Sequence, residues 1–398
     1  MRAWPTRRLG ELTDILSGFA FDSGGFNDSG DLPIVRIRDV VPGTSSTFYR
    51  GKFDEKYVIH KGDVLIGMDG EFNRARWKGG DALLNQRVCK IAPSNGELYE
   101  GYLFHFLPEA LKVIERATPF VTVKHLSVKD IREILIPLPP ISEQRRIADI
   151  LDKADALRVK RRAALAQVDT LARSLFLDMF GDPSAKGWQM VTVSQIAADI
   201  DGAIRTGPFG SQLLHSEFTD KGAVAVLGID NVVENEFRWA NPRFISDAKY
   251  RQLTRYSVQP GDVLITIMGT CGRCAIVPAN IGTAINTKHL CCITLDRSRC
   301  IPEFLHAYFL QHPEARRYLG QKAKGAIMEG LNMGIIKEMP IPLAPIELQY
   351  RFAQRLASID ELRMMHRSGL GKSDALFDSL QHRAFRGELS ASAGSKAA

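Results

Sequence analysis

The chain has 398 residues, a formal net charge of +7 and a pI of about 9.0. That length exceeds what one ordinary hydrophobic core supports, so we expect two or more domains, and the basic charge modestly favours contact with a polyanion. The sequence contains no apolar run long enough for a membrane span, and its N-terminal stretch lacks the apolar core of a secretory signal, so we expect a cytoplasmic protein.

Residues 1–139 are expected to form the first α+β domain. Short apolar segments such as PIVRIRDVV (33–41), DVLIGM (63–68) and RVCKIAP (87–93) are separated by Gly, Pro, Asn and Asp, as strands separated by turns are. A helical patch, LYEGYLFHFLPEALKVIERA (98–117), follows them. This order of elements predicts strands and helices in one compact domain.

Residues 140–183 are expected to form a helical spacer. Ser142 suits a cap of the first turn, and Gly181-Asp-Pro183 suits the end of the helix. Apolar residues recur at helical spacing between these points and form a narrow seam that needs a partner. The seam residues are Ile147, Ile150, Leu151, Leu157, Val168, Leu171 and Leu175.

The same two parts then follow again. Residues 184–344 are expected to form a second α+β domain, residues 345–388 a second helical spacer, and residues 389–398 a disordered tail. The seam of the second spacer contains Phe352, Leu356, Ile359, Leu362, Leu376 and Leu380.

The chain is therefore an internal repeat. IPLPPISEQRRIADILDKADAL (136–157) matches IPLAPIELQYRFAQRLASIDEL (341–362), and KGDVLIGMDG (61–70) matches PGDVLITIMG (260–269). The offset grows from 184 (Trp4 and Trp188) to 205 (Ile136 and Ile341), so the second copy carries 21 more residues. Pairing both seams antiparallel would give a pseudo-twofold dumbbell, which suits duplex DNA.

Several turns of both domains carry Arg, Lys, Asn or Gln beside glycine and aromatic residues. These side chains pair with base edges in the major groove, although each one alone is more often a solvated surface group. The candidate DNA-binding residues are Arg36, Arg38, Arg74, Arg76, Lys78, Asn85, Gln86, Arg87, Arg205, Thr206, Ser211, Gln212, Arg273, Asn286 and Lys288. The basic run at 158–162 either faces phosphate or forms a solvated helix face or a partner contact.

The cysteines offer a weak zinc signal. Cys271-Gly-Arg-Cys274 has the spacing of a zinc knuckle, but Cys291 and Cys292 are adjacent, and neighbours in a strand point to opposite faces. We therefore expect reduced cysteines in a β-rich core, and no metal.

Longer passages resemble a known family. HLSVKDIREILIPLPPISEQRRIADIL (125–151) and LNMGIIKEMPIPLAPIELQYRFAQRL (331–356) resemble the conserved helical regions of specificity subunits of type I restriction-modification enzymes. ILSGFAFDSGGF (15–26) and RTGPFGSQL (205–213) resemble the openings of their target recognition domains. The likeness covers essentially the whole chain, twice and in the same order.

The resemblance implies a protein without catalysis of its own. Each globular domain would read one half of a gapped, bipartite and asymmetric target in double-stranded DNA. The helices would set the spacing and dock two modification subunits. Those methyltransferases would bind S-adenosylmethionine, so no cofactor is expected in this chain. Whether a restriction subunit joins them stays open.

Three other functions would place different demands on the residues. A methyltransferase would need an Asn/Asp-Pro-Pro-aromatic motif, and the only Pro-Pro pair is at 139–140. A metal-dependent nuclease would need clustered carboxylates beside a lysine, for which Asp39 with Asp54-Glu-Lys56 is the nearest pattern. A scaffold that spaces two protein partners without touching DNA is the remaining alternative.

Overall fold

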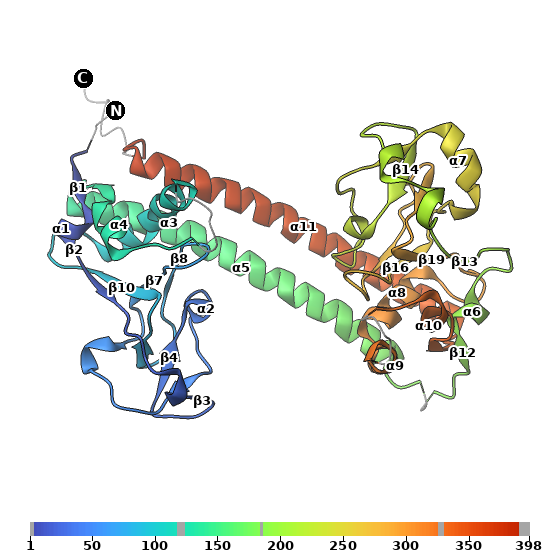
Figure 1. The fold of residues 1–398 in the computed structure, drawn as a ribbon, viewed down its shortest axis with the longest axis horizontal. Helices are drawn as coiled ribbons and strands as arrows, with labels where there is room; N and C mark the ends of the chain where they lie inside the picture. Colours follow the sequence, from blue (N-terminus) through green and yellow to red (C-terminus); the bar gives the residue numbers. More distant parts are fainter. Residues whose placement is uncertain (1–3, 118–123, 184–185, 325–329, 390–398) are drawn as a thin grey trace, which may run out of the picture. The chain divides into compact units, whose positions relative to one another are not determined.

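The computed structural model describes residues 4–117, 124–183, 186–324 and 330–389. The chain folds as two compact units: Met1–Arg162 with Ser368–Ala398, and Ala163–Arg367. Both boundaries fall inside long helices, α5 (Ile141–Phe180) and α11 (Ile346–Phe385), so each unit contains half of each helix (Figure 1). Both helices lie inside the expected spacer segments. The expected tail, apart from Leu389, lies outside the described residues.

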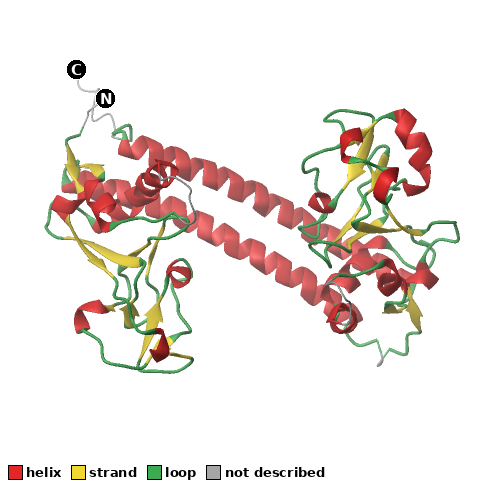
Figure 2. Cartoon of the chain, viewed as in Figure 1, coloured by secondary structure: helices red, strands yellow, loops and turns green. Residues whose placement is uncertain are grey.

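The first unit combines two main sheets with short helices (Figure 2). One sheet is antiparallel, in the order β2-β10-β7-β8, and the other has the order β3-β5-β4-β9-β6, with β4 and β9 parallel. The first sheet comprises β2 (Thr13–Ser17), β10 (Val88–Pro93), β7 (Val64–Gly67) and β8 (Asn73–Arg76). The second comprises β3 (Phe26–Asn27), β5 (Phe48–Tyr49), β4 (Leu32–Val35), β9 (Ala82–Leu84) and β6 (Val58–Ile59).

A third pairing and the helices complete this unit. β1 (Thr6–Arg8) pairs with β11 (Leu135–Pro137) just before α5 begins. The helices are α1 (Leu9–Leu12), α2 (Ile37–Val40), α3 (Glu100–Ala117) and α4 (Val128–Glu133). The core includes the buried side chains of α3 and of the α5 start, together with Phe377 and Ala384 from the far end of the chain.

The second unit repeats this topology. Its antiparallel sheet has the order β13-β19-β16-β17, which matches β2-β10-β7-β8 strand for strand, and β14 and β18 form the parallel pair that matches β4 and β9. These strands are β13 (Ile204–Thr206), β19 (Leu290–Ile293), β16 (Val263–Thr266), β17 (Cys274–Ile276), β14 (Val224–Leu227) and β18 (Ala284–Asn286). The expected tandem repeat of α+β domains is confirmed.

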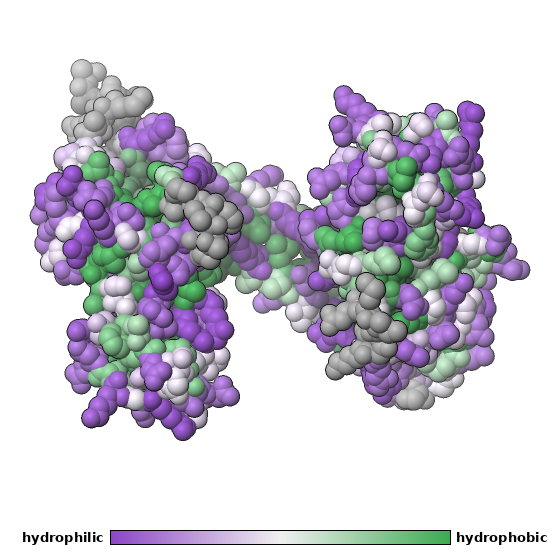
Figure 3. Space-filling model, viewed as in Figure 1, coloured by the Kyte–Doolittle hydropathy of each residue, from purple (hydrophilic) through white to green (hydrophobic). Residues whose placement is uncertain are grey.

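The remaining elements of the second unit also follow the first. β12 (Met190–Thr192) pairs with β20 (Pro340–Pro342) as β1 pairs with β11, and β15 (Phe244–Ile245) pairs with β14. The helices are α6 (Val193–Ile196), α7 (Asp247–Leu253), α8 (Pro302–Gln311), α9 (Pro313–Lys324) and α10 (Met333–Lys337). Hydrophilic side chains cover much of the visible surface of each unit (Figure 3).

The two long helices pack antiparallel within each unit. In the first unit, Arg158 of α5 binds Asp374 of α11. In the second unit, Val168 and Ala172 of α5 contact Ile359 of α11. The buried part of the expected seam is Ile147, Leu151, Val168, Phe352 and Ile359, and the half-buried part is Ile150, Leu175, Leu356 and Leu380.

Four expected seam residues are instead exposed. Leu157 is 41% exposed, Leu171 50%, Leu362 41% and Leu376 50%. Two helices share only a narrow contact, so each turn buries one or two side chains and turns the others outward. Phe377, one residue after Leu376, is the buried residue there, and the Arg158 guanidinium lies over its ring at 4.3 Å. The seam prediction is wrong at these four positions.

Candidate nucleic-acid interface

A buried glutamine fixes the start of each long helix to its unit. The side chain of Gln144 accepts a hydrogen bond from Tyr99 N at 2.8 Å and donates to Glu97 O at 2.8 Å and Pro139 O at 2.9 Å. Gln349 is its counterpart: it accepts from Ile301 N at 3.1 Å. It donates to the carbonyl oxygens of Arg299 and Ala344, at 3.0 and 2.8 Å. Both glutamines are fully buried, so the helix directions are set rigidly in each unit.

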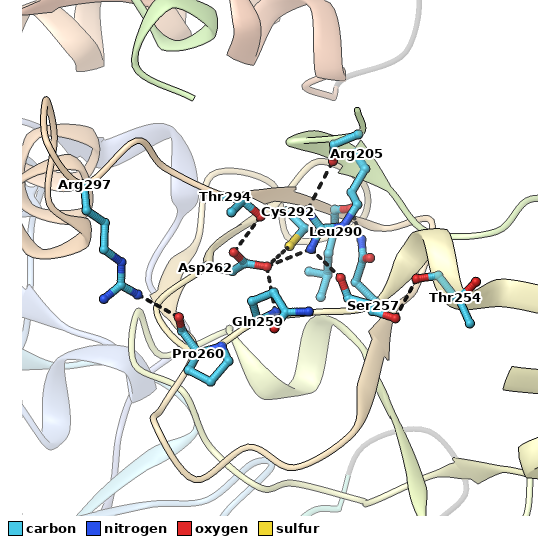
Figure 4. A network of polar contacts seen from close by, with 12 residues as sticks. Arg205, Thr254, Ser257, Gln259, Pro260, Asp262, Leu290, Cys292, Thr294 and Arg297 are labelled. Carbon is cyan, nitrogen blue, oxygen red and sulfur yellow. Dashed lines mark hydrogen bonds and ion pairs between the residues drawn. The ribbon is translucent and has the colours of Figure 1, made fainter. Parts of the chain in front are cut away.

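The repeated Gly-Asp step anchors the antiparallel sheet of the second unit (Figure 4). The carboxylate of Asp262 accepts hydrogen bonds from Gln259 N at 2.9 Å and Thr294 Oγ1 at 2.7 Å. Arg205 Nη2 forms an ion pair with the same carboxylate at 2.7 Å, and both side chains are buried. Arg205 also donates to the backbone oxygen of Ser257. Both terminal nitrogens of this guanidinium are therefore engaged inside the protein.

The first unit makes the same anchor from a different strand. His60 N donates to Asp63 at 2.8 Å, and Lys90 Nζ lies 2.8 Å from the same carboxylate. Lys90 sits on β10 opposite Leu16, whereas the second unit has Cys292 and Arg205 at the corresponding register positions. The aspartate therefore holds the same position in both units, whereas its cationic partner comes from β10 in the first unit and from β13 in the second.

Several candidate DNA-binding residues prove to be structural. Arg74 lies 3.5 Å above the Phe104 ring and donates to Phe104 O at 2.7 Å, and burial lowers its pKa to about 10. Arg76 pairs with Glu100. Their guanidinium groups are engaged within the unit, as that of Arg205 is, so the structure does not support them as base contacts.

Three further candidates are buried or half-buried. Asn85 and Asn286 are buried, and Asn286 Nδ2 donates to Leu290 O at 3.0 Å. Arg36 donates to the Thr47 hydroxyl and lies 3.8 Å from a carboxylate oxygen of Asp39. The two asparagines are buried in their turns, and the Arg36 guanidinium is held by groups of its own unit.

Other candidates do lie on the surface. Arg38, Lys78, Gln86 and Arg87 are exposed in the first unit, although Lys78 Nζ donates to Pro42 O. In the second unit Ser211, Gln212 and Arg273 are exposed, and Thr206 and Lys288 are half-buried. The side chain of Gln212 is partly used, because its oxygen accepts from Phe209 N at 3.2 Å and from Tyr256 Oη at 2.9 Å.

The second unit contains a cleft of about 1260 Å³ next to these surface residues. Its lining includes Thr287, Lys288 and His289 together with Trp239 and Arg243. Burial, followed by the nearby positive charge of Lys288, lowers the pKa of His289, which favours its neutral form. The cleft thus combines donors, an acceptor and an exposed indole, which is chemistry suited to nucleic acid.

Sequence reasoning missed three members of this cleft. His215 and Trp239 stand in stretches with no motif of their own, and His289 directly follows the Asn286-Thr-Lys288 stretch. For His215 and Trp239 the signal that could have found them is the extra length of the second copy, because insertions between shared strands fall in surface loops.

The long helices expose apolar side chains away from their mutual contact. In the first unit these are Leu157, Val159 and Leu376; in the second they are Leu171, Leu362, Met364 and Met365. In the basic run at 158–162, Arg158 and Arg162 both bind Asp374. Exposed apolar helix faces of this kind are typical of protein contacts.

No metal centre is found within the described residues, where no three His, Cys, Asp or Glu side chains gather as metal ligands would. All six cysteines are unpaired and five of them are buried. Burial raises the pKa of the Cys291 thiol to about 12. Asp39 and Asp54, the nearest pattern to a nuclease, bind Arg36 and Lys56 respectively. Among the described helices, none has the length and apolar character needed to cross a bilayer.

Comparisons with known proteins agree with the repeat. A family model described as the type I restriction modification DNA specificity domain matches twice, over residues 1–167 and 186–368. The EcoBI specificity subunit of Escherichia coli is 30% identical, with 98% of this chain and 87% of that subunit covered. The MjaVIII specificity subunit of Methanocaldococcus jannaschii is 23% identical over 84% of this chain and 80% of that subunit.

Solved structures support the fold. The S subunit of a type I restriction-modification system from M. genitalium has a TM-score of 0.57 at 15% identity, with 96% of each chain covered. A subunit from a study of type I complex assembly has a TM-score of 0.54 at 19% identity. With the family model matched in both copies and a relative 30% identical along almost its whole length, the chain belongs to the specificity subunits of type I restriction-modification enzymes.

Proposed function

We propose that the two units read the two unlike halves of a gapped DNA target on behalf of a type I restriction-modification complex. The observation that carries this is the combination of one shared strand order with different surfaces. The second unit has a cleft lined by Lys288, His289 and Trp239, and the corresponding turn of the first unit carries Arg87. Different donors and acceptors select different bases, so the target is asymmetric.

The chain acts without catalysis of its own. The long helices space the two readers, and their exposed apolar side chains dock two modification subunits, at Leu157 and Val159 in the first unit and at Met364 and Met365 in the second. S-adenosylmethionine belongs to those methyltransferase subunits, and a restriction subunit joins the complex where the host encodes one. The assembly works in the cytoplasm, where host DNA is accessible.

A chimera tests the division of labour. Residues 186–344 are replaced by the matching domain of a relative with a different target, and the chimera is expressed with its modification subunit. Methylated sites are then mapped by single-molecule sequencing. We expect the half-site read by residues 1–139 to stay and the other half to change. A change in both halves, or a perfectly palindromic native target, would contradict the proposal.

The purified chain separates this function from its alternatives. We expect it to transfer no methyl group and to cut no DNA when Mg²⁺ and S-adenosylmethionine are supplied. Cleavage by the pure chain would indicate a nuclease. A complex that assembles but methylates no defined sequence would indicate a scaffold without DNA recognition.

A further inference from the structure

The same turn follows the parallel-paired strand in both units. Cys89 of β10 and Cys291 of β19 hold the same register position beside the central strand of their sheets. Arg87 and His289, each two residues earlier, are therefore structurally equivalent. The carbonyl oxygen of each accepts a hydrogen bond at 2.9 Å from the residue that follows the central strand. Comparison of the sequences alone would pair Arg87 with Lys288, the residue before His289.

Close backbone contacts hold both turns in place. A Cβ atom added to Gly18 would lie 2.1 Å from Asn85 O, and one added to Gly207 would lie 1.9 Å from Asn286 O. No side chain fits at either position, so only glycine lets the opening loop of each unit pack onto its turn. The side chains on these turns therefore project from a rigid base, which is what sequence readout requires.

An exposed aromatic ring lies on the opening loop of each unit. Phe19 is 48% exposed, and its main chain bonds to the turn of the first unit through Leu84 O and Gln86 N. Phe209, two residues after Gly207, is 52% exposed in the second unit. Each unit therefore offers one exposed ring on the loop whose backbone packs against the turn, and such a ring suits contact with an apolar group of a ligand.

The Arg87 side chain is oriented outward by its neighbours. Its backbone has a φ of 70°, which is uncommon for a residue with a side chain. Its Nε lies 3.5 Å from Asp69 Oδ2, and its Nη1 lies 3.1 Å from His125 Nδ1. Within the described residues its Nη2 has no hydrogen-bond partner, and 52% of the side chain is exposed. The guanidinium is thus pre-oriented and retains a free donor.

We infer that these two turns carry the specificity-determining base contacts of the two half-sites, an inference that rests on the proposed function. Arg87 reads a guanine edge in one half-site, and Lys288 with His289 reads a base edge in the other. Phe19 and Phe209 pack against apolar groove edges, of which the thymine methyl is the main example.

The test uses Arg87→Ala and Lys288→Ala in the full chain, each expressed with its modification subunit and mapped by methylome sequencing. We expect each variant to relax selectivity about ten- to hundredfold at one base pair of its own half-site. The other half-site and the gap stay unchanged. Arg8→Ala is the matched control, because Arg8 is an exposed cation of the first unit on β1.

The outcomes separate this inference from the proposed function. If wild type methylates a bipartite target and Arg87→Ala leaves every position as selective as before, the inference is overturned and the function stands. If wild type methylates no defined target, the function itself fails. Equal weakening at all sites, without loss of selectivity, would assign Arg87 to phosphate contact and also overturn the inference.

Discussion

The relocated cation of the Gly-Asp anchor allows a repair experiment. Arg205→Leu leaves the buried Asp262 carboxylate without its ion-pair partner, and breaking one side of a buried pair costs about 3 to 5 kcal/mol. Adding Cys292→Lys recreates the arrangement of the first unit, in which Lys90 supplies the charge opposite Leu16. We expect the double variant to recover about half or more of the lost stability, since the lysine restores the pair but adds volume to a packed strand.

The measurement is urea unfolding of the wild type, the two single variants and the double variant. Cys292→Lys alone places a second cation beside Arg205, so we expect it to destabilise as well. A loss of stability in the double variant that is smaller than the sum of the two single losses would show coupling between the two positions. A double variant no more stable than Arg205→Leu would refute the idea that a cation on either of these two neighbouring strands can neutralise the buried aspartate.

Three further predictions concern the long helices and His306. Gln144→Leu removes the bonds to Tyr99 N, Glu97 O and Pro139 O and should lower the unfolding free energy by about 3 kcal/mol, measured in urea; the exposed Gln86→Leu is its control. Four residues inserted after Ala163 lengthen α5 by about 6 Å and rotate its second half by roughly 40° about the helix axis. The gap between the two methylated half-sites should then change by about one or two base pairs, or the complex should fail to assemble. Full activity with an unchanged gap would contradict a spacer role. Burial lowers the pKa of His306 from its usual 6.5, so the unfolded chain binds more protons than the folded chain at acid pH. The unfolding free energy should therefore fall as the pH drops below about 6.5, and His306→Gln should make this pH dependence less steep. An equally steep pH dependence in the variant would exclude His306 as its source.

The sequence predicted the architecture well because repetition amplifies weak signals. A single strand pattern or helix seam is ambiguous, but two matching series in one order restrict both copies to one topology. The glutamine of each helix start shows why the motif recurs: Gln144 and Gln349 make the same three bonds. A requirement imposed by the fold leaves a trace in both copies.

The surface was harder to predict, because exposed and buried arginines look alike in a sequence. Arg74 and Arg87 both follow polar residues in predicted turns, yet one stacks on Phe104 and the other faces solvent. The seam prediction was wrong at Leu376 for a related reason. Leu376 and Phe377 are adjacent and both fit an apolar helix stripe, and only the position of α5 decides which of the two is buried.

The first unit draws its core from both ends of the chain, whereas the second is continuous from Ala163 to Arg367. Phe377 and Ala384 complete a core whose other members precede residue 152. During synthesis the ribosome therefore finishes every residue of the second unit before the first can close. More than two hundred residues must leave the ribosome while the apolar core of the first unit stays exposed, because the C-terminal half of α11 that completes it is synthesised last. A chain that stops near residue 370 would release a finished second reader attached to an open first one, so incomplete chains would be poor competitors for assembly and good substrates for proteolysis.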